Sequence, residues 1–469
     1  MTNSYDTIII GGGHNGLVAA ALLAKAGQKV LVLERRNVLG GAAATEEIWP
    51  GFRVNTGASD AGLFRPEVAE ALDLEKHGLQ FVESTVAAVS LQPDGRHLTL
   101  WHNVEKSVVE IARFSKRDAE KFPAFVKQVT TLTKVLNQIV VLTPPEITQT
   151  SFAEMLPWLK TALQLKRLGK RDMMEFMRVL PMTTSEFLDE WFESDALKGM
   201  LGAAGITGSM QGPYASGTAF MMLYHYLGSP IGGFRSSKFV RGGIGELSAA
   251  LCKSAQSQGA EFRTETEVEK VILEDGAAVG VVLSNGDEIR TKRVISNLDP
   301  YRTLIGLVGA PNLGPQFVRK VRNVRFRGST AKLNLALNEL PRMKGLENKP
   351  ECLDGHMLIS PSLEYLERAY DDAKYGKYSQ NPILDIVIPT ALDSSLAPEG
   401  KHIMSISMQY APYNLKSRNW DECREELSDR IVEALCDFSP NLKGTIQHKQ
   451  MITPLDWEKE YGLTEGSIF

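Results

Sequence analysis

The N-terminal segment alternates short apolar runs with glycine-rich turns. Residues 6–10, DTIII, are mostly β-branched and predict a strand of a parallel sheet that is covered on both faces. Residues 17–26, LVAAALLAKA, predict a helix that Gly27 ends, and residues 29–34, KVLVLE, predict a second strand. This order of strand, turn, helix and strand is that of a βαβ unit.

The hydrophobic pattern changes twice further along the chain. From His97 to about Arg235, longer amphipathic segments with few glycine turns predict helices. Residues 239–251, FVRGGIGELSAAL, predict a tight turn followed by a helix. Residues 259–300 alternate apolar and polar positions between DG and NG turns, which predicts successive hairpin strands. We therefore expect a second domain that is inserted into the first.

The turn between the first strand and helix carries a nucleotide-binding pattern. Gly11, Gly13 and Gly16 have the spacing G-x-G-x-x-G. The first glycine allows a sharp turn, the second lets the backbone approach a pyrophosphate, and the third lets the helix pack close to the strand. The amides at the start of the helix favour phosphate. Glu34, at the end of the second strand, stands where an acid binds a ribose hydroxyl, so a dinucleotide is predicted.

The residues after Glu34 distinguish between dinucleotides. Arg35 and Arg36 could meet the 2′-phosphate of NADP, but Glu34 would repel that phosphate, so we interpret them as adenine or surface contacts. A Gly40–Gly41 doublet and a run of small residues follow. Small side chains let the backbone pass beside an extended ligand beyond its pyrophosphate.

The ordered set from GGGHNG through Glu34 to the Gly40–Gly41 doublet is similar to that of the FAD-dependent amine oxidase and phytoene desaturase superfamily. Within it, the chain resembles the phytoene desaturase and carotenoid isomerase group. Residues 185–228 look like the branch named pyridine nucleotide-disulfide oxidoreductase domain-containing or bacterial phytoene dehydrogenase-like proteins. The resemblance covers essentially the whole chain. It implies an α/β fold, in which a Rossmann-type FAD-binding domain is interleaved with an α+β substrate domain.

The resemblance also implies roles for individual residues. The glycine doublet and Ala42 would contact the phosphate and ribityl region of FAD, residues 55–59 (NTGAS) would run near the isoalloxazine, and the backbone of Val268 would meet adenine. The expected cofactor-binding residues are therefore Gly11, Gly13, Gly16, Glu34, Arg35, Gly40, Gly41, Ala42, Ser59 and Val268.

The resemblance sets the expected domain boundaries. Residues 1–96 and 236–310 would form a discontinuous FAD-binding domain, and residues 97–235 and 311–469 the substrate domain. The family closes with a second glycine-rich flavin motif, whereas no G-x-G occurs here after Gly245. We therefore expect the segment that completes the FAD-binding domain to be absent, and a chain that ends at Phe469 to bind FAD weakly.

Charge and cysteine usage exclude several classes of protein. Lys and Arg total 52 against 56 for Asp and Glu, and this net charge of −4 gives no support to nucleic-acid binding. No cysteine precedes Cys252, so a pyridine nucleotide-disulfide reductase, which needs a redox pair soon after its first helix, is excluded. The 8 histidines are scattered without metal-ligand spacing, so no metal site is predicted.

Localisation follows from what surrounds the predicted elements. The nucleotide fold starts at Tyr5, which leaves no room for a signal peptide, and no apolar stretch reaches the roughly 18–20 residues that span a bilayer. We expect a cytoplasmic protein. From Trp158 to Leu180, basic residues are interspersed with Leu, Met and Phe. Such a helix could lie in a membrane interface or present a solvated face, and both interpretations stay open.

The expected activity is removal of hydride from an extended apolar substrate of polyene or isoprenoid type, with FAD as the acceptor. Such chemistry needs a flavin held near the C–H bond in a dry pocket, and a general base is optional when the C–H is allylic. No catalytic residue is assigned. Tyr224, His225, Arg241 and His356 are candidates for lining the site. A redox-neutral flavin isomerase, a non-catalytic flavin-binding protein and, more weakly, an amine oxidase are the alternatives, and the oligomeric state is not indicated.

Overall fold

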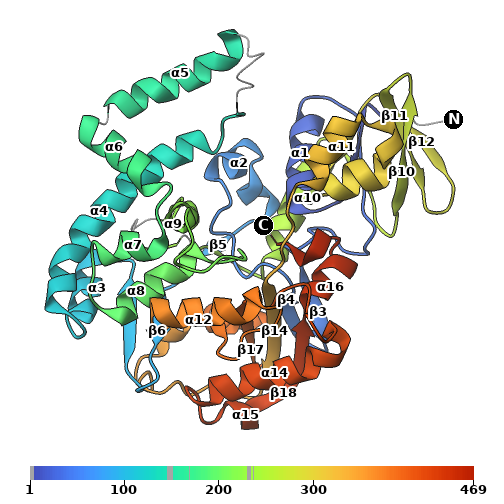
Figure 1. The fold of residues 1–469 in the computed structure, drawn as a ribbon. Helices are drawn as coiled ribbons and strands as arrows, with labels where there is room; N and C mark the ends of the chain where they lie inside the picture. Colours follow the sequence, from blue (N-terminus) through green and yellow to red (C-terminus); the bar gives the residue numbers. More distant parts are fainter. Residues whose placement is uncertain (1–4, 145–151, 168, 230–233, 236, 469) are drawn as a thin grey trace.

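The computed structural model describes residues 5–144, 152–167, 169–229, 234–235 and 237–468. Figure 1 shows a cofactor lobe at the upper right, a large sheet at the bottom and a helical region at the left. The first and last parts of the segment 5–310 together form the cofactor lobe. The helical region is formed by residues that lie between these two parts in the chain. This interleaving agrees with the α/β fold expected from the sequence.

The centre of the cofactor lobe is a parallel sheet with the strand order β13-β1-β2-β9. Every residue of β1 and β2 is buried, which explains their unbroken apolar sequences. The predicted first strand, helix and second strand are confirmed, and the helices α1 and α10 pack against each other beside the sheet. These elements are β1 (Thr7–Ile10), α1 (His14–Lys25), β2 (Val30–Leu33), α10 (Gly245–Ser257), β9 (Glu261–Arg263) and β13 (Val294–Ser296).

A three-stranded antiparallel sheet extends the cofactor lobe at the far right of Figure 1. It contains β10 (Val268–Glu274), β11 (Ala277–Leu283) and β12 (Glu288–Arg290). Gly276 and Gly286 have φ values of 79° and 86°, as the predicted DG and NG turns require. The flanking strands β9 and β13 instead join the parallel sheet, so the predicted run of hairpins is correct only for the middle three strands.

The second lobe is built on a seven-stranded sheet in which only the β6–β15 pair is parallel. In sheet order its strands are β18 (Ile446–Ile452), β14 (Thr330–Leu337), β17 (His402–Gln409), β16 (Ile383–Val387), β15 (His356–Ile359), β6 (Val86–Leu91) and β7 (His97–Trp101). Because β6 belongs to this sheet, we propose that the boundary between the two domains lies before Val86 rather than at residue 96.

The two faces of this sheet differ in chemistry. Along β14, Leu333 and Leu335 point to a hydrophobic core that they share with Leu427 and Ile431 of α14 (Trp420–Cys436). Successive side chains of a strand alternate between faces, so Lys332 lies on the opposite face. Lys332 and Asp385 are both paired with Ser407 of β17, which lies between their strands, so Asp385 lies on the same face as Lys332. The sheet therefore turns a face with buried polar side chains away from its main core.

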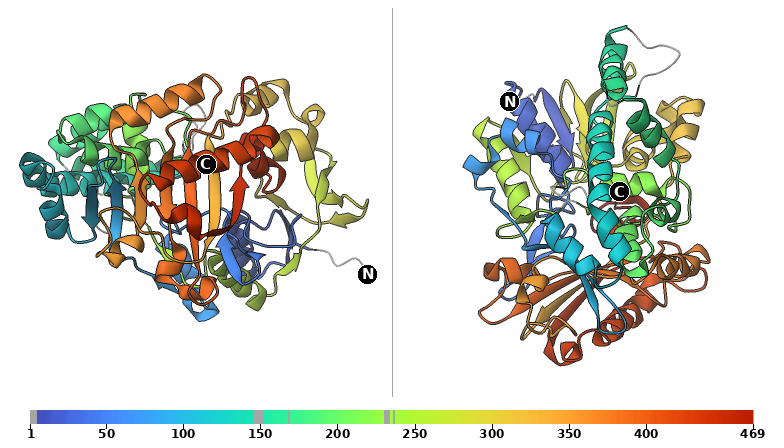
Figure 2. Two further views of the ribbon diagram at one scale, coloured as in Figure 1. Left: turned by 90° about the horizontal axis from the view of Figure 1, so that it is seen from below. Right: turned by 90° about the vertical axis from the view of Figure 1, so that its left-hand side faces the viewer.

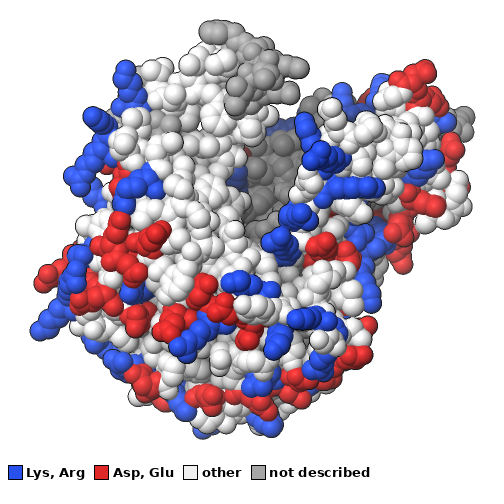
Figure 3. All heavy atoms as spheres, in the orientation of Figure 1, with Lys and Arg blue, Asp and Glu red and all other residues white. Residues whose placement is uncertain are grey.

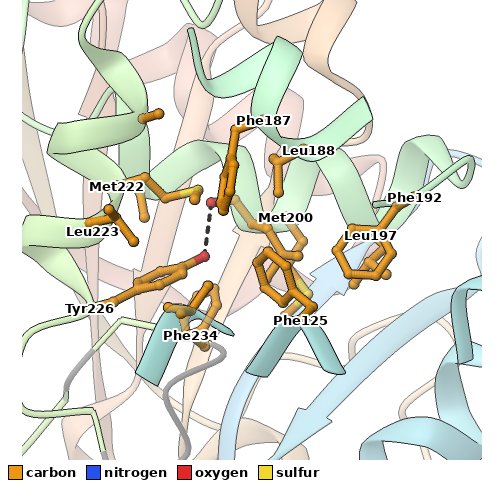
Figure 4. Packing of buried hydrophobic residues seen from close by; sticks show 14 of the residues in the cluster. Phe125, Phe187, Leu188, Phe192, Leu197, Met200, Met222, Leu223, Tyr226 and Phe234 are labelled. Carbon is orange, nitrogen blue, oxygen red and sulfur yellow. Dashed lines mark hydrogen bonds between the residues drawn. The ribbon is translucent and has the colours of Figure 1, made fainter. Parts of the chain in front are cut away.

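The helical region has a core of its own, of which Figure 4 shows a part. Phe125, Phe187 and Phe192 pack together, and the ring centroids of Phe125 and Phe192 are 4.9 Å apart. The buried hydroxyl of Tyr226 donates a hydrogen bond to the carbonyl oxygen of Leu201 at 3.2 Å. The helices of this region are α3 (Val104–Ile111), α4 (Lys116–Ile139), α5 (Phe152–Arg167), α6 (Lys170–Val179), α7 (Thr184–Asp189), α8 (Asp195–Gly202) and α9 (Thr218–His225).

The long helix α4 runs from the sheet lobe towards α5, as the right-hand view of Figure 2 shows. Short elements connect the lobes: β3 (Thr45–Trp49), β4 (Phe52–Asn55), β5 (Phe81–Val82) and β8 (Phe239–Val240). The remaining helices are α2 (Pro66–Ala71), α11 (Pro315–Arg322), α12 (Leu363–Lys374), α13 (Pro389–Leu392), α15 (Leu442–Thr445) and α16 (Pro454–Lys459). Within the described ranges, no helix has both the length and the hydropathy to cross a membrane.

Candidate functional site

The loop between β1 and α1 has the geometry of a phosphate-binding turn. Gly11 has a φ of 92°, which favours glycine, and a Cβ on Gly16 would lie only 2.4 Å from the carbonyl oxygen of Gly11. The helix α1 has no side-chain cap and no acidic residue in its first turn. Its first amides are therefore available to an anion, and the helix dipole favours a negative charge there.

Glu34 lies against this loop. Its carboxylate accepts hydrogen bonds from the backbone amides of Gly12 at 2.7 Å and Arg36 at 2.8 Å. The side chain is thus fixed at the carboxyl end of β2, next to the turn that would hold a pyrophosphate. This is the position at which an acid binds the adjacent ribose.

The glycine doublet packs directly on the phosphate turn. The amide of Gly40 donates to the carbonyl oxygen of Gly12 at 2.7 Å, and a Cβ on Gly41 would lie 3.3 Å from the Cα of Gly13. Gly40 has a φ of 111°. A side chain on Gly57 would lie 2.1 Å from the carbonyl oxygen of Ala42, so the next turn is also closely packed. The predicted motifs therefore form one continuous backbone surface, and its binding of the dinucleotide stays a prediction.

Two predicted cofactor residues lie at the outer end of this surface. Val268 begins β10 and is buried, and the neighbouring Thr266 amide donates to the carbonyl oxygen of Glu34 at 2.8 Å. Arg35 instead donates from its guanidinium to the carbonyl oxygens of Lys459 and Glu460, at 3.0 and 2.9 Å. Contacts of Val268 and Arg35 with adenine stay predictions.

The glycine turn over 239–251 contacts protein in this structure. Gly243 has a φ of 94°, and its Cβ would lie 2.5 Å from the hydroxyl of Thr45. The amide of Gly245 donates to that hydroxyl at 2.8 Å, and the amide of Ile244 donates to the side-chain oxygen of Asn55 at 3.0 Å. The turn therefore supports β3 and β4, which lead into the segment 55–59.

A buried lysine that the sequence reasoning missed contacts this segment. The amine of Lys332, on β14, donates to the carbonyl oxygen of Asn55 at 2.8 Å, to that of Gly57, and to the hydroxyl of Ser59 at 3.3 Å. The side chain is 2% exposed. A signal was present in the sequence: the run TAKLNLAL places Lys and Asn at alternate positions of an otherwise apolar strand.

The environment of Lys332 changes its acidity. Burial lowers the pKa of its amine to about 7, although the charges of Asp385 and Asp60 oppose this shift. A buried ammonium costs much free energy unless it is paired, so the neutral amine is favoured as the pH rises through neutrality. Lys332 can therefore take up or release a proton at neutral pH.

Four charged residues form an ionic cluster beside Lys332, in which His356 is buried and the other three are partly buried. The imidazole of His356 lies between two carboxylates: Nδ1 is 2.7 Å from Asp385 and Nε2 is 3.4 Å from Asp60. The guanidinium of Arg235 pairs with Asp385 and lies 2.7 Å from Nδ1 of His356. The ring of Phe239 stacks on that of His356 with an interplanar angle of 27°. Asp60 follows the NTGAS segment, so the cluster joins the cofactor lobe to the sheet.

Of the four residues predicted to line the site, only His356 lies in this cluster. His225 is buried, its Nδ1 is 3.0 Å from the carbonyl oxygen of Met221, and burial lowers its pKa to about 4. Arg241 is exposed and Tyr224 packs against the helical core. The imidazole of His225 is therefore neutral at physiological pH, and its place in the site stays a prediction.

A narrow pocket opens beside Ser59 at the same junction. Six of its nine lining residues are apolar: Val82, Phe239, Val240, Pro389, Leu392 and Leu396. Asn55, Ser59 and Asp393 complete the lining. The segment expected near the isoalloxazine is therefore flanked by apolar side chains on one side and by Lys332 on the other. Among the residues that the structure describes, no group of His, Cys, Asp and Glu could hold a metal ion.

Comparisons with known proteins agree with this site. Residues 16–465 match the family described as flavin containing amine oxidoreductase. The chain is 33% identical to pyridine nucleotide-disulfide oxidoreductase domain-containing protein 2 of Rattus norvegicus, over 99% of this chain and 84% of that protein. It is 28% identical to one component of the limonene dehydrogenase of Castellaniella defragrans, over 93% of this chain and 79% of that protein.

Two further proteins complete the comparison. Prolycopene isomerase 2 of an Oncidium hybrid cultivar is 25% identical over 96% of this chain and 72% of its own length. A solved oxidoreductase of Methanosarcina mazei superposes with a TM-score of 0.60 at 18% identity, covering 95% of this chain and 87% of that one. Together these findings confirm the predicted fold class, the predicted family resemblance and FAD as the cofactor.

Proposed function

The chain belongs to the flavin containing amine oxidoreductase family, and on this premise we propose that it is an FAD-dependent dehydrogenase of an extended apolar substrate. The observation that carries the proposal is the similarity, over more than 90% of this chain, to limonene dehydrogenase and prolycopene isomerase. The apolar side chains beside Ser59, next to the segment expected at the isoalloxazine, agree with an apolar ligand. The pocket between them has a volume of about 10 Å³, room for about one water molecule, so these side chains must move apart to admit a substrate.

The residues of the site have distinct roles in this proposal. Bound FAD supplies the acceptor of two electrons. The phosphate turn and Glu34 hold its ADP portion, and the doublet Gly40–Gly41 lets the backbone approach the rest. The apolar side chains beside Ser59 contact the substrate. Lys332 holds or releases a proton beside the segment 55–59, because its pKa lies close to neutrality.

The relatives support an apolar substrate more than a charged amine. By their names, the limonene dehydrogenase acts on a hydrocarbon and prolycopene isomerase acts on a polyene. The second name favours one alternative, a flavin-dependent isomerisation without net oxidation. The two reactions place the same demands on the pocket and differ in whether the flavin ends reduced.

An anaerobic incubation distinguishes these functions. The full chain, loaded with FAD, is mixed in turn with a cyclic monoterpene, a linear polyene and putrescine, and the flavin absorbance and the products are followed. Dehydrogenation bleaches the flavin and yields a product with one more double bond. An isomerised product without bleaching would favour the isomerase, and bleaching by putrescine alone would contradict the apolar substrate.

We further propose that the substrate is taken from an anionic lipid surface by the helices α5 and α6. Among the described residues, eight of the seventeen exposed large hydrophobic side chains lie between residues 140 and 177. They are Val140, Val141, Met155, Leu156, Leu159, Leu163, Met174 and Met177. Such a concentration of exposed apolar surface is typical of an interaction site.

The charges around these helices select the partner. Lys160, Lys166, Lys170 and Arg171 are exposed on the same two helices. Figure 1 shows α5 and α6 at the outer edge of the molecule, and Figure 3 shows Lys and Arg side chains along that edge. Basic residues beside an apolar helix face fit the headgroups and acyl chains of an anionic bilayer.

Vesicle binding tests this surface. The full chain should sediment with phosphatidylcholine vesicles that contain phosphatidylglycerol, more weakly with phosphatidylcholine alone, and less at high salt. The double variant Leu156→Glu/Leu163→Glu should lose at least tenfold in binding. The control Phe317→Glu/Val324→Glu changes two exposed apolar side chains in and just after α11 and should bind normally. Equal binding by both variants, or a dimer that only the first variant disrupts, would contradict a lipid partner.

A further inference from the structure

The ionic cluster of Asp60, Arg235, His356 and Asp385 joins residues from four separate segments of the chain. Asp60 follows the NTGAS segment of the cofactor lobe, whereas His356 and Asp385 lie on β15 and β16 of the seven-stranded sheet. Arg235 precedes β8 and completes the cluster. We propose that this cluster is a latch that fixes the segment 55–60 on the sheet. The latch thereby holds the oxygens of Asn55, Gly57 and Ser59, called here the oxygen cage, around the amine of Lys332.

The segment 55–60 is fixed at both ends by different contacts. At its start, the side-chain oxygen of Asn55 accepts hydrogen bonds from the Thr45 hydroxyl at 2.8 Å and the Ile244 amide at 3.0 Å, both within the cofactor lobe. At its end, the carboxylate of Asp60 reaches His356 on the sheet. The three oxygens that receive the Lys332 amine lie between these two points. Releasing Asp60 would therefore loosen the cage at its sheet side.

The imidazole of His356 is suited to hold two carboxylates. Burial and the charge of Arg235 lower the pKa of His356, but the charge of Asp385 and the hydrogen bonds to Asp385 and Asp60 together outweigh them, so the pKa is raised overall. Protonated histidine donates from both nitrogens, so one ring can hold Asp385 and Asp60 together. The stacked ring of Phe239, which also lines the apolar pocket, keeps the imidazole in this orientation.

The charges of the four latch residues also affect the pKa of Lys332. With His356 protonated, two carboxylates, one guanidinium and one imidazolium sum to zero, so a neutral lysine amine leaves the region uncharged. Asp60 and Asp385 raise the pKa of Lys332 against the effect of burial. The other ionisable groups that face the cluster are His225, whose pKa is lowered to about 4, and Tyr226, whose pKa is raised. Neither changes charge near neutrality, so Asp60 and Asp385 set the balance.

The titration of Lys332 provides the test. The unfolding free energy of the full chain without added FAD is measured against pH for pairs that differ only in Lys332→Met, and the difference within a pair reports the pKa of Lys332. In the Asp60→Asn background the midpoint should fall by about one pH unit, because a nearby negative charge is lost. In the Asp393→Asn background it should not move, because the buried Asp393 bonds to Gly242 and Ser395 outside the cluster.

A second measurement tests whether the latch holds the segment 55–60 in place. His356→Gln keeps a polar side chain but removes the charge that holds both carboxylates, and it should raise the dissociation constant of FAD at least tenfold, as Asp60→Asn should. Equal shifts of the Lys332 midpoint in the Asp60→Asn and Asp393→Asn backgrounds would refute the latch, as would unchanged FAD affinity in His356→Gln. The inference rests on the proposed function only through the role of Lys332. The titration uses neither FAD nor substrate, so its result tests the latch independently of the substrate.

Discussion

At the scale of single residues, two glycines of the same motif are required for different reasons. Gly13 has a φ of −68°, which any residue adopts, and a Cβ there would meet the side chain of Asn297, whose nitrogen would lie 2.7 Å away. A Cβ on Gly16 would instead meet the backbone oxygen of Gly11. We propose that the first position lets the backbone approach a ligand, whereas the second is required for packing of the helix on the strand.

These two glycines give a matched pair of variants. Gly13→Val should lose FAD binding while the chain keeps its fold, because Asn297 can move and the added methyl groups fill the space of the pyrophosphate. Gly16→Val should lose both, with unfolding at clearly lower temperature. Circular dichroism melting and the FAD content of the purified variants measure the two effects. Normal FAD content in Gly13→Val would mean that the motif has been misinterpreted.

Lys332 gives a second prediction at this scale. Its pKa is about 7 in the folded chain against about 10.4 when unfolded. Between these values the unfolded chain binds more protons, so stability rises with pH, by up to about 1.4 kcal/mol per pH unit. Relative to Lys332→Met, the wild-type chain should therefore gain unfolding free energy from pH 7 to pH 10. Urea unfolding of both proteins at several pH values checks this, and parallel curves would contradict it.

At the scale of elements, α16 connects the two lobes. Its N-terminus is a capping box in which Thr453 and Asp456 bond reciprocally, and the guanidinium of Arg424 pairs with Asp456. The indole of Trp457 donates to the carbonyl oxygen of Thr330 on β14 at 3.1 Å. At the other end, carbonyl oxygens of Lys459 and Glu460 receive the guanidinium of Arg35. The helix is therefore fixed to both the sheet and the cofactor lobe.

The capping box can be tested separately. Thr453→Ala removes the side chain that accepts the amide of Asp456 and should lower the unfolding free energy by about 1 kcal/mol. Thr131→Ala is a suitable control, because its hydroxyl bonds only within an exposed turn of α4. Equal losses in the two variants would show that the cap contributes nothing particular.

At the scale of the whole molecule, the cofactor surface is divided between contiguous and distant segments. The turn 11–16, Glu34 and the doublet 40–41 contact one another within the first part of the chain. The surroundings of the segment 55–59 instead need β14, β15 and β16 of the sheet lobe. We therefore propose that the residues that bind the ADP portion and the residues around the flavin ring are supplied by different lobes.

This division predicts which nucleotides bind. ADP alone should raise the melting temperature of the full chain, since the phosphate turn and Glu34 belong to one lobe, and FAD should raise it further. NADP should give no shift, because its 2′-phosphate would meet the carboxylate of Glu34. Thermal shift assays at saturating nucleotide check the order, and stabilisation by NADP equal to that by FAD would contradict it.

The sequence by itself determined the parts of the protein whose physics is local. A run of β-branched residues, glycines at fixed spacing and an acid after the second strand predicted β1, α1, β2 and the dinucleotide turn, because each constraint acts within a few residues. The DG and NG turns predicted the hairpins of β10–β12 for the same reason. The strands β9 and β13 were misplaced, because their parallel partners lie far away in the chain.

Only the tertiary structure decided what surrounds the segment 55–59. Lys332 meets carbonyl oxygens of Asn55 and Gly57 more than 270 positions away. Asp60, Arg235, His356 and Asp385 become a cluster only when the sheet closes on the cofactor lobe. Each of these residues, taken alone in the sequence, is an ordinary charged side chain. Burial in a low-dielectric environment, which requires both lobes, is what changes the pKa of the lysine and forces the remaining charges to pair.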